Sequence, residues 1–219
     1  SNYLSQIAIV KTVGGVVFPN HPLAATKEEL HKLKGYYPDI EKSRAEAKTL
    51  LADAGKSGLK IDFSNRGVDQ PYKVVGTWLV DQWRKIGVDA AQRVQPSGPF
   101  YDTLRKTRDH DVSIDFNCQA VIDPVADISK FLPSSGSNFT GFESPELESI
   151  YQQIEKEGDP AKLRSLIRKY EHLVLDETAS SMITLWWYKI NVHRSYVKGW
   201  KVAPSHYLAQ QLDPVWLDK

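Results

Sequence analysis

The sequence predicts an α/β fold, with a mostly parallel sheet flanked by helices. Two observations carry this prediction. Between residues 59 and 116 the hydrophobic period switches repeatedly between that of a strand and that of a helix. Both connections between successive strands are also long enough to hold a helix, which is how parallel strands are joined.

The chain before this region is expected to contain two helices and a connection. Apolar residues recur with helical spacing over residues 3–11. Three prolines interrupt residues 16–39, which we therefore expect to run over the surface. Ser43 and Glu46 form a capping-box pattern, and Gly55 stands where a helix C-terminus belongs. These signals predict a helix from Ser43 to Gly55.

Five elements make up the predicted β-α-β-α-β run. In the strands apolar residues alternate with polar or charged ones, and in the first helix the apolar residues share one face. The elements are a strand at 59–63, a helix at 71–86, a strand at 88–94, a helix at 99–107 and a strand at 112–116.

The remainder of the chain is expected to be mixed. Residues 117–140 are rich in turn formers, and a loop of this length is either a wrong assignment or a functional element. Ser144 and Asp159 are each followed by proline, which predicts the starts of two helices. Aromatic and β-branched residues predict strands at 182–192 and 200–202.

Composition excludes several classes of protein. Lys and Arg number 28 against 27 Asp and Glu, so no basic field is available to hold nucleic acid. The longest uncharged run, residues 13–26, is too short to span a bilayer. A single cysteine, Cys118, forms no internal disulfide and no multi-cysteine zinc site; its place beside a strand favours a packing role over a reactive thiol.

No catalytic or metal-binding motif is complete. No two histidines have the spacing that zinc sites favour, and residues 109–111, Asp-His-Asp, fit a solvated turn better than a metal cluster. The Gly-x-Ser-x-Gly motif of hydrolases is absent. Asp115 and Asp123 remain as the acid and base of an alternative hypothesis, a small hydrolase.

Three consecutive aromatic residues, Trp186, Trp187 and Tyr188, form an unusual group. Adjacent residues of an extended chain point to opposite faces, so the three side chains do not all enter one core. At least one is expected to face a cleft, a partner or another lobe, although packing is the commoner fate of any single ring.

Several short segments, taken together, resemble one family. They are the helix pattern at 43–55, QWRKIGV at 82–88, HDV at 110–112, Asp-Pro at 123–124 with Phe131, and residues 138–147. In order and spacing they resemble the C-terminal lobe of family 5 extracellular solute-binding proteins. These are the dipeptide and oligopeptide receptors of ABC importers, and the resemblance runs from about Gly15 to the C-terminus.

The resemblance implies a type II periplasmic-binding-protein-like lobe that faces a larger N-terminal region, absent here, across a hinge. Residues 41–203 would form the ligand-binding lobe, while residues 1–40 and 204–219 would run toward the absent lobe. It further implies a non-enzymatic, exported protein of the periplasm or the outer face of the membrane. Its partners would be a small solute and ABC permease subunits, and it would need no cofactor.

Peptide receptors of this family usually carry a Trp at the end of the third strand and an Asp three residues later, which pairs with the peptide's amino group. The matching positions here are Asn117 and Ala120. Without that carboxylate, a buried ammonium would lack compensation. The amides of Asn117 and Gln119 suit a neutral, polyhydroxylated or modified ligand instead.

Ligands of open parallel sheets bind beyond the carboxyl ends of the strands. Arg66 lies at such an end, although a surface-turn role is an equal alternative for it. Together with the resemblance, this place in the sheet predicts six ligand-binding residues: Asn65, Arg66, Asn117, Gln119, Ala120 and Trp187. The fragment is also expected to expose apolar side chains toward the absent lobe and to self-associate through them; these are Val16, Val17, Phe18, Tyr207 and Trp216.

Overall fold

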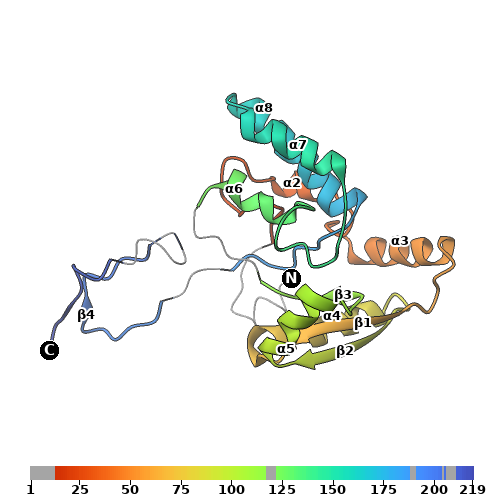
Figure 1. Ribbon diagram of the computed structural model, residues 1–219, viewed down its shortest axis with the longest axis horizontal. Helices are drawn as coiled ribbons and strands as arrows, with labels where there is room; N and C mark the ends of the chain where they lie inside the picture. The colour runs from red at the N-terminus through yellow and green to blue at the C-terminus, as the bar shows by residue number, and fades with distance from the viewer. Residues whose placement is uncertain (1–12, 117–121, 188–190, 204, 206–210) are drawn as a thin grey trace.

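The structure is a computed structural model that describes residues 13–116, 122–187, 191–203, 205 and 211–219. Figure 1 shows a group of helices above a small sheet, with an arm that carries strand β4 projecting to one side. The helix predicted over residues 3–11 lies outside the described residues. Within the described part of the chain, no helix is long and apolar enough to cross a membrane.

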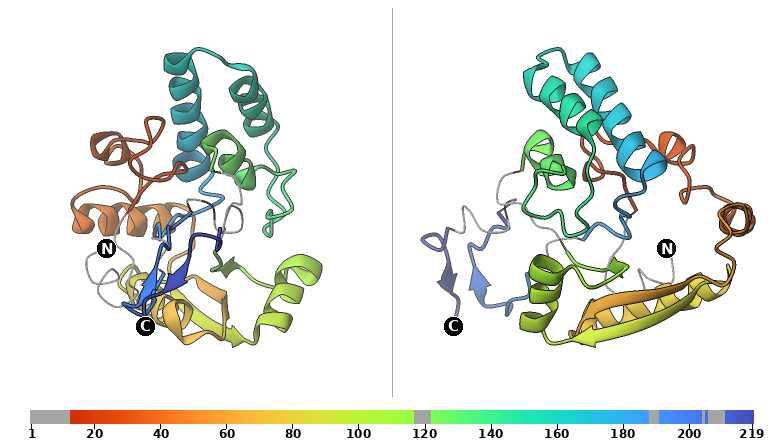
Figure 2. Two further views of the ribbon diagram at one scale, coloured as in Figure 1. Left: turned by 90° about the vertical axis from the view of Figure 1, so that its left-hand side faces the viewer. Right: turned by 45° about the vertical axis from the view of Figure 1, so that its right-hand side comes forward.

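The sheet has three parallel strands in the order β2-β1-β3. They are β1 (Lys60–Arg66), β2 (Asp89–Gln95) and β3 (Val112–Ser113). Phe63 of β1 is paired with Gln92 on one side and Val112 on the other. The predicted parallel sheet is therefore confirmed, although β3 is shorter than expected. Both views of Figure 2 show helices α7 and α8 standing away from this sheet.

Helices fill both crossovers, as predicted. The first contains η1 (Asp69–Lys73), which runs into α4 (Val74–Arg84), and the second contains α5 (Ser97–Asp102), which runs into η2 (Thr103–Thr107). Phe63 is fully buried and packs with Val75 and Leu79 of α4. Its ring also meets Trp83 edge-on, with 5.1 Å between ring centroids. This contact joins α4 to β1 and forms the smaller of the two cores.

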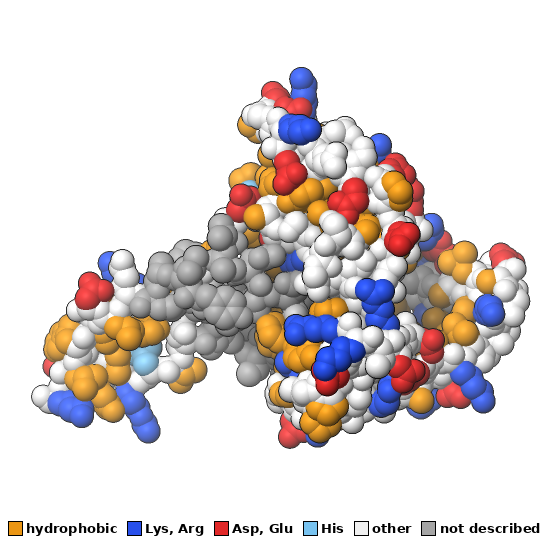
Figure 3. Space-filling model, in the orientation of Figure 1, with side chains coloured by type: hydrophobic (Ala, Val, Ile, Leu, Met, Phe, Trp, Pro, Cys, Tyr) orange, Lys and Arg blue, Asp and Glu red, His pale blue; other side chains and the backbone are white. Residues whose placement is uncertain are grey.

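The chain from residue 182 onward differs from what the sequence predicts. Residues 182–187 form no regular strand, and 188–190 lie outside the described residues. No strand forms at 200–202; instead β4 (Val197–Lys198) pairs antiparallel with β5 (Trp216–Leu217), inside the segment expected to be irregular. Strand propensity was misleading because the side chains of 185–187 pack against separate neighbours rather than along one ladder. Hydrophobic side chains gather over the arm (Figure 3).

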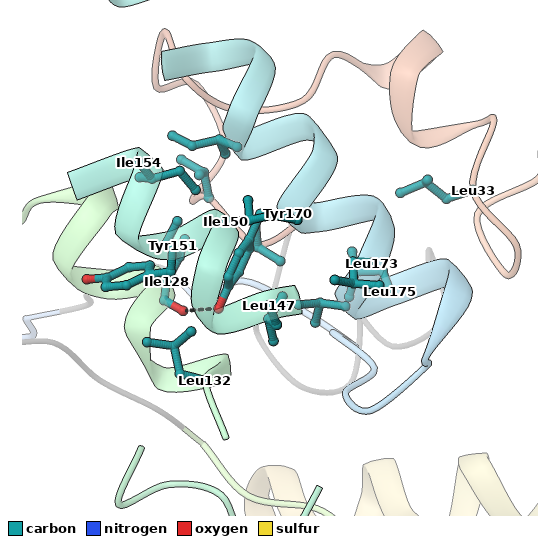
Figure 4. Packing of buried hydrophobic residues seen from close by; sticks show 14 of the residues in the cluster. Leu33, Ile128, Leu132, Leu147, Ile150, Tyr151, Ile154, Tyr170, Leu173 and Leu175 are labelled. Atoms are coloured by element: carbon teal, nitrogen blue, oxygen red, sulfur yellow. Dashed lines mark hydrogen bonds between the residues drawn. The ribbon is translucent and has the colours of Figure 1, made fainter. Parts of the chain in front are cut away.

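The larger core is helical. Its elements are α2 (Lys27–Leu30), α6 (Pro124–Ile128), η3 (Ser129–Phe131), α7 (Pro145–Lys156), α8 (Pro160–His172) and η4 (Leu173–Glu177). Buried stripes of α7 and α8 face each other around Tyr170, whose hydroxyl donates a 2.9 Å hydrogen bond to the carbonyl of Ile128 (Figure 4). Ser144 and Asp159 cap α7 and α8 as predicted.

The predicted loop at 117–140 is interrupted by helix. Asp123 caps α6 by accepting a 2.9 Å hydrogen bond from the Val125 amide, and Pro124 occupies the first turn. The Asp-Pro pair at this point is the same start signal that begins α8. Residues 117–121 lie outside the described residues.

Residues 16–39 run over the surface only in part, because four of their side chains are buried. Val16 and Val17 are 0% and 1% exposed, and Leu30 and Leu33 join them in the helical core. Prolines exclude regular hydrogen bonding but not burial, which explains the error. The expectation that Val16 and Val17 face an absent partner is therefore wrong.

Helix α3 (Ile40–Asp53) begins earlier than predicted. Asp39 accepts hydrogen bonds from the Glu41 and Lys42 amides, which makes it the N-cap and places Ser43 inside the helix. None of its residues is buried, so its apolar stripe does not face a core. The helix does end where expected, with Gly55 at a φ of 65°.

Candidate ligand-binding site

The carboxyl end of β1 carries a buried polar side chain, Asn65. It is 0% exposed, and its Nδ2 donates a 2.8 Å hydrogen bond to the Tyr72 carbonyl. Its Oδ1 accepts a 2.7 Å hydrogen bond from the Arg66 amide. Because both ends of the amide are occupied, Asn65 holds the turn after β1 to the start of the first crossover.

Arg66, the last residue of β1, projects into a group of aromatic rings. Its guanidinium carbon lies 4.2 Å from the ring centroid of Tyr72 and 5.1 Å from that of Phe116. Nη1 donates a 3.0 Å hydrogen bond to the hydroxyl of Tyr101. Stacking on ring faces suits a guanidinium, because the face of an aromatic ring is its negative side.

Tyr101 connects Arg66 to a carboxylate. Its hydroxyl donates a 3.1 Å hydrogen bond to Oδ1 of Asp115. Burial raises the pKa of Asp115, although hydrogen bonds from Phe116 and Tyr101 and the charge of Arg66 act in the opposite direction. Burial likewise raises the pKa of the Tyr101 hydroxyl. The three side chains form a polar row in which Tyr101 separates the two charges.

Trp187 reaches the same group of rings. Its ring centroid lies 6.4 Å from that of Tyr72, and the side chain remains half-exposed. Trp186 has different neighbours: its Nε1 donates a 3.0 Å hydrogen bond to the Gly15 carbonyl, and its ring lies beside Phe18. The adjacent tryptophans thus have separate surroundings, as expected for an extended chain.

Tyr72 is the common neighbour of all the predicted ligand-binding residues that the structure describes. Its carbonyl accepts a hydrogen bond from Asn65, its ring face contacts Arg66, and its ring is tilted against that of Trp187. The other three predicted residues, Asn117, Gln119 and Ala120, lie outside the described residues. The structure therefore brings together three predicted side chains that are up to 122 positions apart (187 − 65) in the sequence.

Sequence reasoning missed Tyr72, Tyr101 and Phe116. Tyr72 and Tyr101 lie in the first helices after β1 and β2, and Phe116 follows the end of β3. Such helices border the carboxyl edge of a parallel sheet. An aromatic residue within the first turns of each crossover was the available signal. On the same edge, Gln95 accepts a 3.1 Å hydrogen bond from Ser64 and donates one of 3.1 Å to Thr103.

The other candidates for chemistry have structural partners. Asp109 forms an ion pair with Arg93, and Asp111 accepts a 2.7 Å hydrogen bond from the Asp62 amide. Asp123 is engaged in capping α6. Across the described ranges, no three His, Cys, Asp or Glu side chains are grouped to hold a metal ion.

No family model and no curated protein sequence matches this chain. Several solved structures do match it. The periplasmic binding protein DppA of Helicobacter pylori, in complex with the peptide STSA, matches 100% of the chain with a TM-score of 0.76 at 19% identity. This chain has a periplasmic-binding-protein-like fold.

Two further structures share this fold. The substrate-binding domain of an oligopeptide ABC transporter from Bacillus anthracis matches 82% of the chain, with a TM-score of 0.65 at 23% identity. The murein tripeptide binding protein MppA of Escherichia coli matches 78%, with a TM-score of 0.61 at 18% identity. The chain spans 41% of the H. pylori protein, 36% of the B. anthracis protein and 31% of the E. coli protein.

Proposed function

We propose that this chain belongs to the substrate-binding component of an ABC importer and captures a small polar solute without catalysis. The meeting of Asn65, Arg66 and Trp187 around Tyr72 carries the proposal. It lies beyond the carboxyl end of β1, where ligands of parallel sheets bind. Support also comes from the fold, because the whole chain matches a solved structure of a protein in complex with a peptide.

Residues 41–203 act as a ligand-binding lobe in this proposal. Residues 1–40 and 204–219 lead toward a second lobe, although Val16 and Leu30 themselves pack in the helical core of this one. A second lobe is in keeping with the coverage of similar proteins, because the chain spans only 31–41% of their lengths. Ligand touches both lobes only when the hinge is closed, so its differential affinity shifts the population toward the closed form. The closed form is the one presented to the permease subunits.

The proposed ligand does not depend on a free amino group. Ala120 stands where a carboxylate would pair with an ammonium, and Asn117 and Gln119 offer uncharged amides nearby in sequence. A peptide with a blocked amino terminus, or another polar metabolite, fits this set of residues. The proposed location is the periplasm or the outer face of the membrane, where an importer meets its solute.

Native mass spectrometry of the chain, purified without unfolding, tests the proposal first. We expect a small molecule that is retained in the native spectrum and lost on denaturation. Calorimetric titration with trialanine and N-acetyl-trialanine then tests ligand class, and the acetylated form is expected to bind at least as tightly. Lack of both a retained solute and peptide binding would count against a receptor.

The same samples test the hydrolase alternative. Incubation with peptide should leave it intact, and Asp115→Asn and Asp123→Asn should remove no turnover. Release of cleaved products by the chain, abolished by either substitution, would establish the hydrolase instead. Asp123→Asn retains an N-cap side chain, so it keeps the fold while removing the charge.

A further inference from the structure

Helix α6 and the turn η3 after it carry an ion pair inside the protein, Asp127–Lys130, which we call the buried pair. The Nζ of Lys130 lies 3.0 Å from each carboxylate oxygen of Asp127. The side chains of Lys130 and Asp127 are only 8% and 7% exposed, whereas other Lys–Asp pairs one helical turn apart in the described residues are 44–85% exposed. Replacing a buried ion pair by apolar side chains is often neutral or stabilising, so stability does not account for this one.

The ammonium group of the buried pair also faces an aromatic ring from a distant segment. The Nζ of Lys130 lies 5.0 Å from the ring centroid of Trp186 and 5.3 Å from that of Phe131. A cation is attracted to the negative face of an aromatic ring, most strongly to tryptophan and most strongly where water is excluded. The buried pair thus presents its positive end to Trp186, and its carboxylate balances the charge.

Residues of the N-terminal segment hold the Trp186 ring on its other sides. The ring Nε1 donates a hydrogen bond of 3.0 Å to the Gly15 carbonyl, and Phe18 meets the ring edge-on with 6.3 Å between centroids. A Cβ on Gly14 would lie 2.8 Å from Cδ1 of the indole, so the ring rests directly on glycine backbone. We call Gly14, Gly15, Phe18 and Lys130 the Trp186 socket. Lys130 is its charged member.

We propose that the buried pair fixes the ring of Trp186 and thereby directs Trp187 toward Tyr72 in the candidate site. Adjacent residues of an extended chain point to opposite faces, so a fixed Trp186 also fixes the direction of Trp187. The Trp187 side chain is 52% exposed and meets the Tyr72 ring across 6.4 Å, so its own contacts hold it weakly. This inference rests on the proposed function and makes Lys130 a positioning residue that acts through Trp186.

A charge at this place sets an orientation that an apolar side chain would not. An apolar residue at position 130 would pack against the indole at several rotations of the ring, whereas an ammonium group attracts its face. Asp127 in turn fixes the ammonium, because both of its oxygens accept hydrogen bonds from Nζ. Low dielectric inside the protein strengthens both interactions. The buried pair therefore favours one arrangement of the Trp186 ring over others that bury similar area.

The test follows Trp187 in the full 219-residue chain, with its six tryptophans replaced by 5-fluorotryptophan. Its fluorine NMR resonance is assigned by its loss in Trp187→Phe. Lys130→Met keeps the length of the side chain and removes the charge. We expect this variant to shift the Trp187 resonance and to bind N-acetyl-trialanine about tenfold more weakly, in line with the strength of a desolvated cation–ring contact. Trp187 is the informative ring, because the Trp186 resonance would respond to any change at its neighbour Lys130.

Two further variants separate positioning from stability. Lys130→Met alone leaves Asp127 without its counter-ion, in a place where burial already raises the pKa of the carboxyl. The double variant Asp127→Leu/Lys130→Met removes both charges and should keep the wild-type Tm, while it shifts the Trp187 resonance as Lys130→Met does. Lys85→Met is the matched control, because Lys85 lies 2.9 Å from Asp81 in an exposed pair at the end of α4. It should leave the resonance and the affinity unchanged.

The outcomes separate this inference from the proposed function. A wild-type Trp187 resonance and wild-type affinity in the double variant would overturn the positioning role, because the buried pair would then contribute to stability alone. Equal shifts in Lys85→Met would also overturn it, since the loss of any lysine charge would then explain the effect. Failure of the wild-type chain to bind N-acetyl-trialanine or retain any solute would contradict the proposed function, and the fluorine spectra would still decide whether Lys130 directs Trp187.

Discussion

At the scale of single residues, Glu171 links two distant parts of the chain. It is 3% exposed, and its Oε1 accepts a 2.8 Å hydrogen bond from the Val16 amide, 155 positions away. Its other oxygen pairs with Arg168, one turn earlier on α8. A Cβ on Gly15 would lie only 1.7 Å from Oε1, so this contact also requires glycine there. The buried N-terminal segment depends on this carboxylate.

Replacing Glu171 by Gln should destabilise the chain by about 3 kcal/mol, because the largely buried Arg168 would lose its counter-ion. Urea denaturation followed by circular dichroism measures the change. Glu146→Gln is the matched control, since Glu146 faces Lys169 across 3.9 Å on the exposed surface and should cost much less. Similar losses in both variants would show that the Glu171 contact carries no special weight.

Glu29 makes a pH-dependent contribution to the stability of the folded chain. Hydrogen bonding from Arg164 lowers the pKa of Glu29 from 4.5 to about 2. A carboxyl whose pKa is lower in the folded state stabilises it above the unfolded pKa, and that contribution is lost as the pH falls from 4.5 toward 2. Glu29→Gln should therefore lower Tm at neutral pH, and the gap to wild type should narrow at about pH 3. A gap that stays constant across this range would contradict the assignment.

At the scale of elements, α4 approaches β1 so closely that a glycine is needed between them. A Cβ at Gly76 would lie 2.3 Å from Nδ2 of Asn65, which is the amide that holds Tyr72. The position of Tyr72, and with it the candidate site, therefore depends on how α4 packs on the sheet.

Gly76→Ala should destabilise the chain and weaken ligand binding, although alanine is the better helix former by about 1 kcal/mol. Gly98 of α5 is the control, because nothing lies within 4 Å of a Cβ placed there. Gly98→Ala should be neutral or mildly stabilising. Thermal unfolding of the two variants gives the comparison, and equal Tm values would show that α4 has room to move away from Asn65.

At the scale of the whole molecule, the projecting arm exposes apolar side chains. Leu212, Trp216 and Leu217 are 60%, 55% and 54% exposed, and β4 and β5 form only a two-stranded ladder. Such a ladder is marginal by itself, and exposed apolar patches favour association. A second lobe or a second copy of the chain would cover this surface.

Sedimentation equilibrium of the 219-residue chain should show a mass that rises with concentration. Replacing Trp216 and Leu217 together by Ser should reduce the rise, because it removes the apolar surface of β5. Leu50→Ser, at a side chain of α3 that is 55% exposed, should leave association unchanged. A single monomeric mass at every concentration would contradict self-association.

Much of the local structure was predictable because its signals are local. Asp159 and Ser144 cap the helices that their sequence positions indicate, and the alternation around Phe63 marks β1. Asp39 was missed as the cap of α3 because Ser43 offered a similar pattern four residues later. The prediction of a strand at 182–192 is wrong over residues 182–187, because packing on separate neighbours overrode aromatic propensity there.

The sequence by itself determined the alternation of strands and helices between residues 59 and 116, and through their periods the parallel sheet at whose carboxyl edge we propose that a ligand binds. Tertiary structure alone decided that Tyr72, Tyr101 and Phe116 surround Arg66, since these rings come from three separate segments. It also decided the burial of Val16, whose partner lies on α8. Periods and caps act over a few residues, whereas these contacts form only when distant segments pack together.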